Sequence, residues 1–140
     1  MDFLRPPLNP VSIRADELSR LIIGAAIEVH RLKGPGLIES IYEKCLAREL
    51  SLRGIEAVNQ RIIQVEYKGL VFEEPLRLDM LVESCLLLEL KSVQEIVPIH
   101  KAQLLSYMKQ LDVPLGLLIN FHEIKLVDGL VRMMLPGANQ

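Results

Sequence analysis

The sequence is poor in aromatic residues and cysteine, and it contains no long apolar run. Tryptophan is absent, 4% of the 140 residues are aromatic, and the two cysteines lack CxxC spacing or paired histidines. Free buried thiols at Cys45 and Cys85 are therefore favoured over a disulfide or a zinc site. No apolar stretch approaches the roughly 20 residues of a membrane span, so we expect no membrane partner. The first ten residues lack the apolar core of a secretory signal, which makes the cytoplasm the expected location.

The sequence also lacks an excess of positive charge. Its 16 Lys and Arg residues stand against 18 Asp and Glu residues, which leaves a formal net charge of -2. The whole protein therefore cannot act as a polycation on nucleic acid or anionic lipid, and any phosphate-binding surface must be local. Because no internal repeat or linker interrupts the chain, we expect residues 1–140 to form a single domain with a Pro-rich lead at residues 1–12.

Hydrophobic periodicity divides the chain into helical and extended segments. Apolar spacings of three and four predict helices over residues 16–33, 37–52 and 98–111. Alternating or continuous apolar residues predict strands over residues 62–67, 70–72, 76–82, 86–92 and 115–121, with Pro75 either closing the first hairpin or restarting the next strand. The Asp128-Gly129 pair predicts a terminal hairpin of residues 124–127 and 130–134. Two helices, a run of strands, a third helix and further strands indicate an α/β (α+β) fold, in which helices cover a sheet.

The most informative stretch is the second hairpin, whose turn we place at Ser84. Residues whose numbers sum to 168 then face each other, so Asp79 lies opposite Glu89 and Arg77 lies opposite Lys91. Alternation along the strands puts Asp79, Glu89 and Lys91 on one face. The other face is expected to be unbroken and apolar, formed by Leu78, Met80, Val82, Leu86, Leu88 and Leu90.

This polar cluster suggests metal chemistry, although a simpler explanation stays open. Two carboxylates so close repel each other unless a cation lies between them, and a hard divalent ion with oxygen ligands fits that position. The Lys91 ammonium could hold a phosphate oxygen or orient an attacking water. An ordinary cross-strand salt-bridge ladder on a solvated face would use the same residues. The nearly continuous apolar run of residues 86–91 argues against the ladder, because charged residues in a buried strand are rare.

Several short segments together resemble a known family. Residues 36–42, Gly-Leu-Ile-Glu-Ser-Ile-Tyr, look like the signature of the GxxExxY proteins, a family placed within the PD-(D/E)xK nuclease superfamily. The resemblance spans about residues 18–132 and continues through residues 77–79, 88–92, 100–107 and 116–121. It implies a restriction-endonuclease-like core, with a central mixed β-sheet flanked by α-helices.

The resemblance also implies roles for individual residues. Asp79 matches the motif aspartate, Glu89 the acidic ligand and Lys91 the motif lysine. Glu39 matches the glutamate that the first core helix contributes to the metal shell. With the Leu90 carbonyl, these carboxylates would hold one or two Mg²⁺ or Mn²⁺ ions. We therefore expect the three carboxylates to converge in one pocket.

The third helix carries further candidates. Gln103 and Tyr107 are similar to the QxxxY element of the helicase-associated nuclease branch, and their i, i+4 spacing puts them on one side of a helix. We expect both to face the carboxylate pocket, where they would orient side chains or the substrate backbone. His100 shares their helix face, and like His30 it is either a capping or solvated histidine or a ligand.

Three more residues keep two interpretations each. Tyr42 either packs in the core beside the site or donates a hydrogen bond to a phosphate. Glu43 is a solvated-face residue or an alternative ligand. Arg77 could line a groove with other cations, or it is an ordinary surface charge.

Two functions follow from these residues. The first is a metal-dependent phosphodiesterase acting on DNA or RNA, as the resemblance implies. The alternative is a non-catalytic nucleic-acid-binding or protein-interaction module that keeps the nuclease fold. Because a near-neutral chain offers few clustered cations for a duplex, a partner subunit or a homodimer would have to supply that surface.

Overall fold

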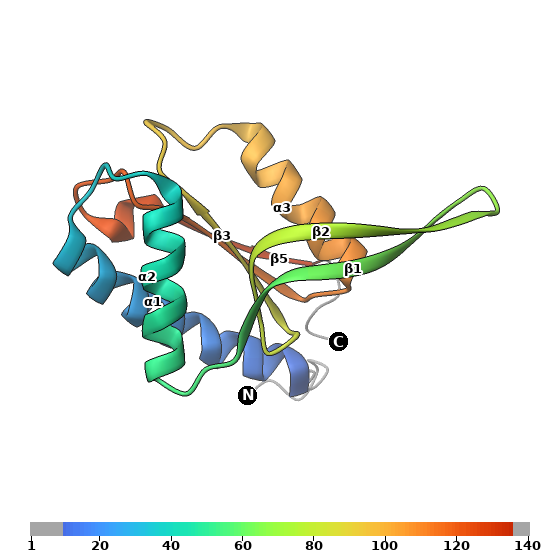
Figure 1. The fold of residues 1–140 in the computed structure, drawn as a ribbon, viewed down its shortest axis with the longest axis horizontal. Helices are drawn as coiled ribbons and strands as arrows, with labels where there is room; N and C mark the ends of the chain where they lie inside the picture. The colour runs from blue at the N-terminus through green and yellow to red at the C-terminus, as the bar shows by residue number, and fades with distance from the viewer. Residues whose placement is uncertain (1–9, 136–140) are drawn as a thin grey trace, which may run out of the picture.

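The computed structural model describes residues 10–135 and shows one mixed sheet packed between helices (Figure 1). The elements in chain order are α1 (Pro10–Lys33), α2 (Glu39–Leu52), β1 (Ala57–Tyr67), β2 (Leu70–Val82), β3 (Leu86–Lys91), α3 (Pro98–Leu111), β4 (Leu115–Asn120), the 3-10 helix η1 (Leu126–Gly129) and β5 (Leu130–Met134). The five strands lie in the order β1-β2-β3-β4-β5. Only β3 and β4 are parallel among these neighbours, and α3 makes the crossover between them. This mixed sheet flanked by helices confirms the expected fold class.

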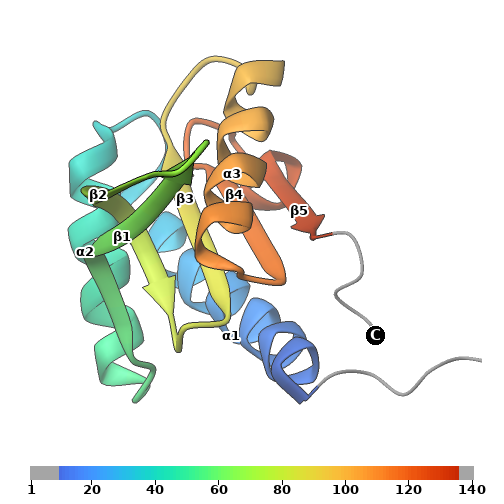
Figure 2. The same ribbon diagram turned by 90° about the vertical axis from the view of Figure 1, so that its right-hand side faces the viewer.

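The two faces of the sheet are covered by different helices. α1 and α2 lie on one face and α3 lies on the other (Figure 2). Side chains alternate along β3, so Leu86 and Leu88 join the core under α1 and α2, whereas Leu87 joins a second core under α3. Each of these leucines is fully buried, which contributes about 1.5–3 kcal/mol of transfer free energy per side chain. The β3 strand is therefore apolar on both faces because helices cover both.

The expected helices and the second hairpin are present, with some shifted ends. α1 ends at Lys33 as expected, followed by Gly34 at φ 77°, but it begins at Pro10 rather than at Asp16. Proline is tolerated in a first helical turn because that N–H has no partner within the helix. Part of the expected Pro-rich lead is thus helical, and residues 1–9 lie outside the described part. Glu83 and Ser84 form the tight turn of the second hairpin, both with positive φ.

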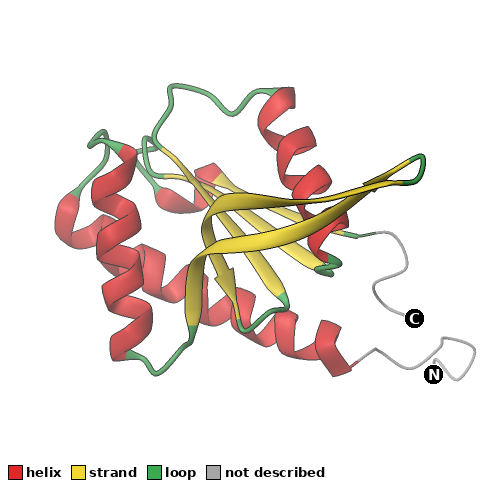
Figure 3. Ribbon diagram, turned by 45° about the vertical axis from the view of Figure 1, so that its right-hand side comes forward, coloured by secondary structure: helices red, strands yellow, loops and turns green. Residues whose placement is uncertain are grey.

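The first hairpin is much longer than its sequence pattern indicated. β2 runs through Pro75, which pairs with Ile62 of β1. β3 pairs with β2 only from Met80 to Val82, so the outer part of β2 has a partner on one side alone. A proline without an N–H is tolerated on such an unpaired side. The outer part of this hairpin extends beyond the body of the molecule (Figures 1 and 3). We call residues 61–76, which include the base of this extension, the arm.

The expected terminal hairpin is wrong in its first strand. The segment before Gly129 forms η1 instead of a strand, and β5 pairs with β4, Leu115 facing Met134. A Cβ at Gly129 would lie 2.5 Å from the Asn120 carbonyl oxygen, so this glycine permits a close backbone approach. The Asp128-Gly129 pair therefore ends a helical turn and does not form a two-residue hairpin turn.

Candidate active site

The predicted register brings Asp79 next to Glu89. Met80 faces Leu88 and Val82 faces Leu86, so the facing numbers sum to 168 as expected. The backbone pairing of β2 with β3 ends at Met80. Beyond it, the Asp79 side chain, and not a backbone carbonyl, accepts the hydrogen bond from β3. The Leu90 N–H donates a hydrogen bond of 2.6 Å to Asp79 Oδ2. This bond holds the Asp79 carboxylate against β3.

An irregularity in β2 surrounds Asp79 and changes two expectations. The β1–β2 register shifts between Val58 and Gln60, so the irregular part of β2 lies at residues 78–80. Leu78 consequently packs under α3 while Met80 packs under α1 and α2, and the expected unbroken apolar face is wrong at Leu78. The backbone of Arg77 pairs with Gln60 of β1, and the β2–β3 pairing does not extend beyond Met80 and Leu88, so the expected pairing of Arg77 with Lys91 is wrong. The Arg77 side chain lies outside the described part.

The Glu89 carboxyl group is mostly buried, and its protonation is strongly perturbed. Burial, the negative charge of Asp79, a hydrogen bond between the two carboxyl groups and the charge of Glu39 together raise its pKa to about 8. Lys91 acts in the opposite sense. Glu89 therefore carries a proton at neutral pH, and that proton is shared with a neighbouring carboxylate.

Glu39 approaches the same group of charges from α2, of which it is the first residue. Burial raises the pKa of Glu39, the charge of Asp79 adds to this effect, and Lys91 opposes it. Glu43, one helical turn later, also raises the pKa of Glu39. Glu39 therefore lies within electrostatic reach of Asp79 on β2 and of Glu89 and Lys91 on β3.

Tyr42 anchors the loop that places Glu39. Its hydroxyl donates to the Gly34 carbonyl at 2.6 Å and accepts from the Leu37 N–H at 2.9 Å. The ring is fully buried and stacks on Phe121, with 4.3 Å between the centroids. Both bonding directions of the hydroxyl are thus used within the core, where a phosphate has no access.

The end of β3 holds the same loop from the other side. The Ser92 hydroxyl donates to the Leu37 carbonyl, directly beside the start of α2. The Phe121 N–H donates to the Lys91 carbonyl at 2.8 Å. The buried Asn120 side chain bonds both the N–H and the carbonyl of Val93. Lys91 therefore stands on a backbone segment that is tied on both sides.

The carboxylates are neighbours, but they do not form a preassembled metal site. Among residues 10–135, no three carboxylate, imidazole or thiol side chains are arranged to hold one metal ion. The closest association is the hydrogen-bonded pair of Asp79 and Glu89. A shared proton relieves the repulsion in this pair, as a bound cation would do.

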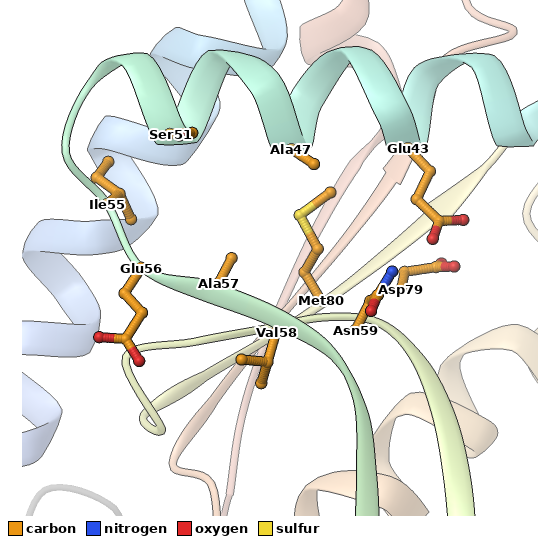
Figure 4. Close-up of a pocket in the computed structure, with 10 residues that line it drawn as sticks. All are labelled: Glu43, Ala47, Ser51, Ile55, Glu56, Ala57, Val58, Asn59, Asp79 and Met80. Atoms are coloured by element: carbon orange, nitrogen blue, oxygen red, sulfur yellow. The ribbon is translucent and has the colours of Figure 1, made fainter.

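A cleft leads from Asp79 along the inner side of α2. Its volume is about 340 Å³, and it lies between α2 and the inner ends of β1 and β2 (Figure 4). Glu43, Asn59 and Asp79 gather at one end of it. The remaining lining residues are Ala47, Ser51, Ile55, Glu56, Ala57, Val58 and Met80. Asn59 was not predicted from the sequence, because the alternation of apolar and polar residues along a strand does not indicate where the pairing register shifts.

The candidates on α3 are placed differently from one another. Gln103 is exposed, whereas Tyr107 is half-buried and packs against the core under α3. The His100 ring accepts a hydrogen bond from the Val97 N–H at 3.1 Å and so caps α3. His30 donates from Nε2 to the Glu123 carbonyl at 2.8 Å, which ties α1 to the segment before η1. Both histidines therefore have local structural bonds.

Comparison with known proteins identifies the family. The family model of the PD-(D/E)XK nuclease superfamily matches residues 16–133, and the chain belongs to this superfamily. Comparison with curated protein sequences finds no match. A solved structure described as the crystal structure of SSO0001 aligns with a TM-score of 0.52 and 16% identity, and it covers 90% of this chain but 61% of that one. The chain thus spans less than two thirds of SSO0001, and the likeness shows a shared fold.

No helix within residues 10–135 combines the length and the hydropathy that a transmembrane helix requires.

Proposed function

We propose that this protein is a metal-dependent phosphodiesterase that cleaves DNA or RNA, of the GxxExxY type within its superfamily. One observation carries the proposal: the Glu89 carboxyl group is mostly buried against Asp79, with a pKa raised to about 8. Burial of two acids together is costly for folding and is typical of sites that bind a cation or transfer a proton. A surface salt-bridge ladder would instead hold the pKa of its carboxylates low.

The donor set suits Mg²⁺ or Mn²⁺. Asp79 and Glu89 supply carboxylate oxygens, and Glu39 and the Leu90 carbonyl are the further ligands that we propose. Such an ion, when bound, neutralises charge on a phosphodiester and lowers the pKa of a water molecule. Because Glu89 is protonated at neutral pH, binding of the ion must release its proton.

Lys91 supplies the positive charge of the site itself. Its attraction for Glu39 and Glu89 opposes the rise in their pKa values, so its ammonium group lies near both. We assign it to the phosphate: it donates hydrogen bonds to a non-bridging oxygen or orients the attacking water. Gln103 and Tyr107 remain proposed contacts to the substrate backbone.

The second candidate is a nucleic-acid-binding or protein-interaction module without turnover. The lack of a preassembled three-ligand site among residues 10–135 favours it. Unlike the first candidate, this module would need neither the metal ion nor Lys91 to bind its partner.

A cleavage assay separates the two. The full chain is incubated with single- and double-stranded DNA and RNA, with Mg²⁺, with Mn²⁺ and with a chelator. We expect cleavage only when Mg²⁺ or Mn²⁺ is present. The cleavage rate of Lys91→Ala should be lower than that of the wild type by about 10²–10⁴-fold. Lys33→Ala, an exposed lysine at the end of α1, is the matched control and should cleave normally. Binding without cleavage under all conditions would favour the second candidate, and equal cleavage by Lys91→Ala would contradict the first.

A further inference from the structure

The arm has one apolar face that is exposed and that no other element within residues 10–135 covers. Val65 faces Phe72 and Tyr67 faces Leu70, and residues that face each other in an antiparallel pair project on the same side. Tyr67 is 62% exposed, Leu70 60% and Phe72 39%. We call the four residues Val65, Tyr67, Leu70 and Phe72 the arm face. The other side of the arm is mixed, since Val71 faces Glu66 and Gln64 faces Glu73 there.

The arm face continues the core under α3. Ile63 lies on the same side of β1 one pair inward from Val65, and it is 8% exposed. Leu76 of β2 packs against the core under α3. One apolar strip therefore begins inside the molecule and runs outward along the arm. Figure 3 shows that the hairpin extends past the end of α3.

A covering partner is expected on physical grounds. A two-stranded hairpin is at best marginally stable alone in water, and it gains stability when its apolar face packs against another surface. A contiguous exposed patch that includes two aromatic rings is typical of an interaction site. We propose that the arm face packs against the arm face of a second copy of this chain, giving a two-fold symmetric dimer.

The charges of the arm favour a second copy over nucleic acid. Residues 61–76 carry two cations, Arg61 and Lys68, against three anions, Glu66, Glu73 and Glu74. Aromatic rings that stack on bases work within a positively charged groove, and this arm has no such excess.

The arm is complementary to itself in an antiparallel arrangement. Glu74 faces Ile63 and so lies on the apolar side at the inner end of the arm. Lys68 lies at the tip, with Nζ 5.4 Å from the centroid of the Tyr67 ring. A two-fold axis near Val65 brings the tip of one arm to the inner end of the other, so Lys68 of each copy meets Glu74 of its mate.

The arm face would form the apolar centre of a dimer interface and not the whole of it. Taking roughly 150–250 Å² for a large side chain, the exposed parts of Tyr67, Leu70 and Phe72 present on the order of 300 Å². The charged and polar residues around them enlarge the patch towards the roughly 800 Å² that each partner buries in a standard interface. An apolar centre with a charged rim is also the usual composition of such interfaces.

Two neighbouring aliphatic residues provide a matched test. Leu70 lies on the arm face and Val71 on the opposite side, and they are 60% and 55% exposed. We would measure the mass of the full 15.8 kDa chain by sedimentation equilibrium between roughly 1 and 100 μM. We expect the wild type and Val71→Asp to be dimers and Leu70→Asp to be a monomer. Circular dichroism would verify that both variants fold, because each site is exposed.

Other outcomes would overturn the proposal. A monomeric wild type over this range excludes the dimer, and dissociation of both variants or of neither excludes the arm face as its interface. For the antiparallel arrangement, Lys68→Glu and Glu74→Lys should each weaken the dimer at least about threefold, and their combination should restore it. Failure of the combination to restore dimerisation would exclude this arrangement. Because the mass measurement needs no metal or substrate, its result is independent of the proposed nuclease activity.

Discussion

Two glutamates of one hairpin show opposite electrostatic behaviour. Glu83, at the turn between β2 and β3, accepts two hydrogen bonds from the Arg14 guanidinium at 2.9 and 2.8 Å. This pairing holds the pKa of Glu83 below its ordinary value. Glu89, near the other end of β3, is buried beside Asp79, and its pKa is raised to about 8. At the turn of the hairpin a glutamate pairs with an arginine, whereas near its other end a glutamate lies beside an aspartate.

The difference separates a structural carboxylate from a candidate functional one. Glu83 favours the folded state when it is ionised, because its charge is neutralised by α1. Glu89 favours the folded state when it is protonated, so its ionisation opposes folding at neutral pH. A residue that opposes folding in its usual charge state is typical of a site where binding supplies the missing charge. Four experiments test this contrast, from the largest expected effect to the smallest.

Replacing Tyr42 tests the loop that places Glu39 near Glu89. Tyr42→Ala removes the stacked ring and both hydroxyl bonds, and we expect it to lower the free energy of unfolding by about 3–5 kcal/mol in urea titrations. Tyr42→Phe keeps the ring and should cost about 1–2 kcal/mol, since the buried Gly34 and Leu37 groups lose their partner. A loss below about 1 kcal/mol in Tyr42→Ala would show that the loop does not depend on this anchor.

Removing the charge of Glu89 tests the raised pKa in metal-free protein. Because its folded pKa of about 8 lies above the unfolded value of 4.5, the wild type loses stability as pH rises between these two values. Glu89→Gln does not titrate, so above pH 8 we expect it to be more stable than wild type by on the order of 2–4 kcal/mol. Urea titrations across this pH range should show the gap narrowing as the pH falls towards 4.5. A constant gap would contradict the assignment.

Adding metal should relieve the repulsion between the Asp79 and Glu89 carboxylates and should not affect Glu83. Millimolar Mg²⁺ or Mn²⁺ should stabilise the wild type by about 1–3 kcal/mol, which raises the melting temperature by several degrees. Asp79→Ala and Glu89→Ala should respond much less, because each removes a ligand. Lys91→Ala should respond at least as strongly as wild type, since it removes a cation that competes with the ion.

Glu83→Ala is the matched control for metal, because Glu83 is a carboxylate in the same hairpin. It should respond as the wild type does in thermal melts. Identical responses of wild type and Asp79→Ala would exclude a metal site that uses Asp79.

The smallest effect is expected at Glu83. Its ion pair with Arg14 is partly exposed, so Glu83→Gln should cost at most about 1 kcal/mol at neutral pH. The lowered pKa means that this contribution is present above the unfolded pKa and is lost as pH falls through the folded value. Wild type and variant should therefore converge in acid. A cost that persists at low pH would point to packing instead of charge.

Local patterns predicted much of the frame around the site. The α1 end at Lys33 and the bounds of α3 at Pro98 and Leu111 agree with the expectation. The pairing of β2 with β3 agrees with it too, because a tight turn and alternating side chains determine which residues face each other. The expected hairpin at Asp128-Gly129 failed for the opposite reason. β5 found its partner in β4, a strand that precedes it by ten residues or more, and a local turn signal contains no information about that choice.

The arm and the register shift were also beyond local patterns. Whether β2 has one neighbour or two at Pro75 depends on where its pairing with β3 ends, and this pairing stops at Met80 and Leu88, before β3 itself ends at Lys91. Asn59 enters the cleft only because the β1–β2 pairing slips beside it. Such slips depend on how the sheet bends over its helices, which a residue pattern does not describe.

The sequence by itself determined that Asp79 and Glu89 would be neighbours, because hairpin register is a local property of the turn and the strands. Only the tertiary structure decided how they ionise. The raised pKa of Glu89 requires burial of its side chain in the folded protein, and it depends on charges that arrive from β2 and from α2. Electrostatic energies depend on distances in space and on access to water, and both are set by elements far apart in the chain.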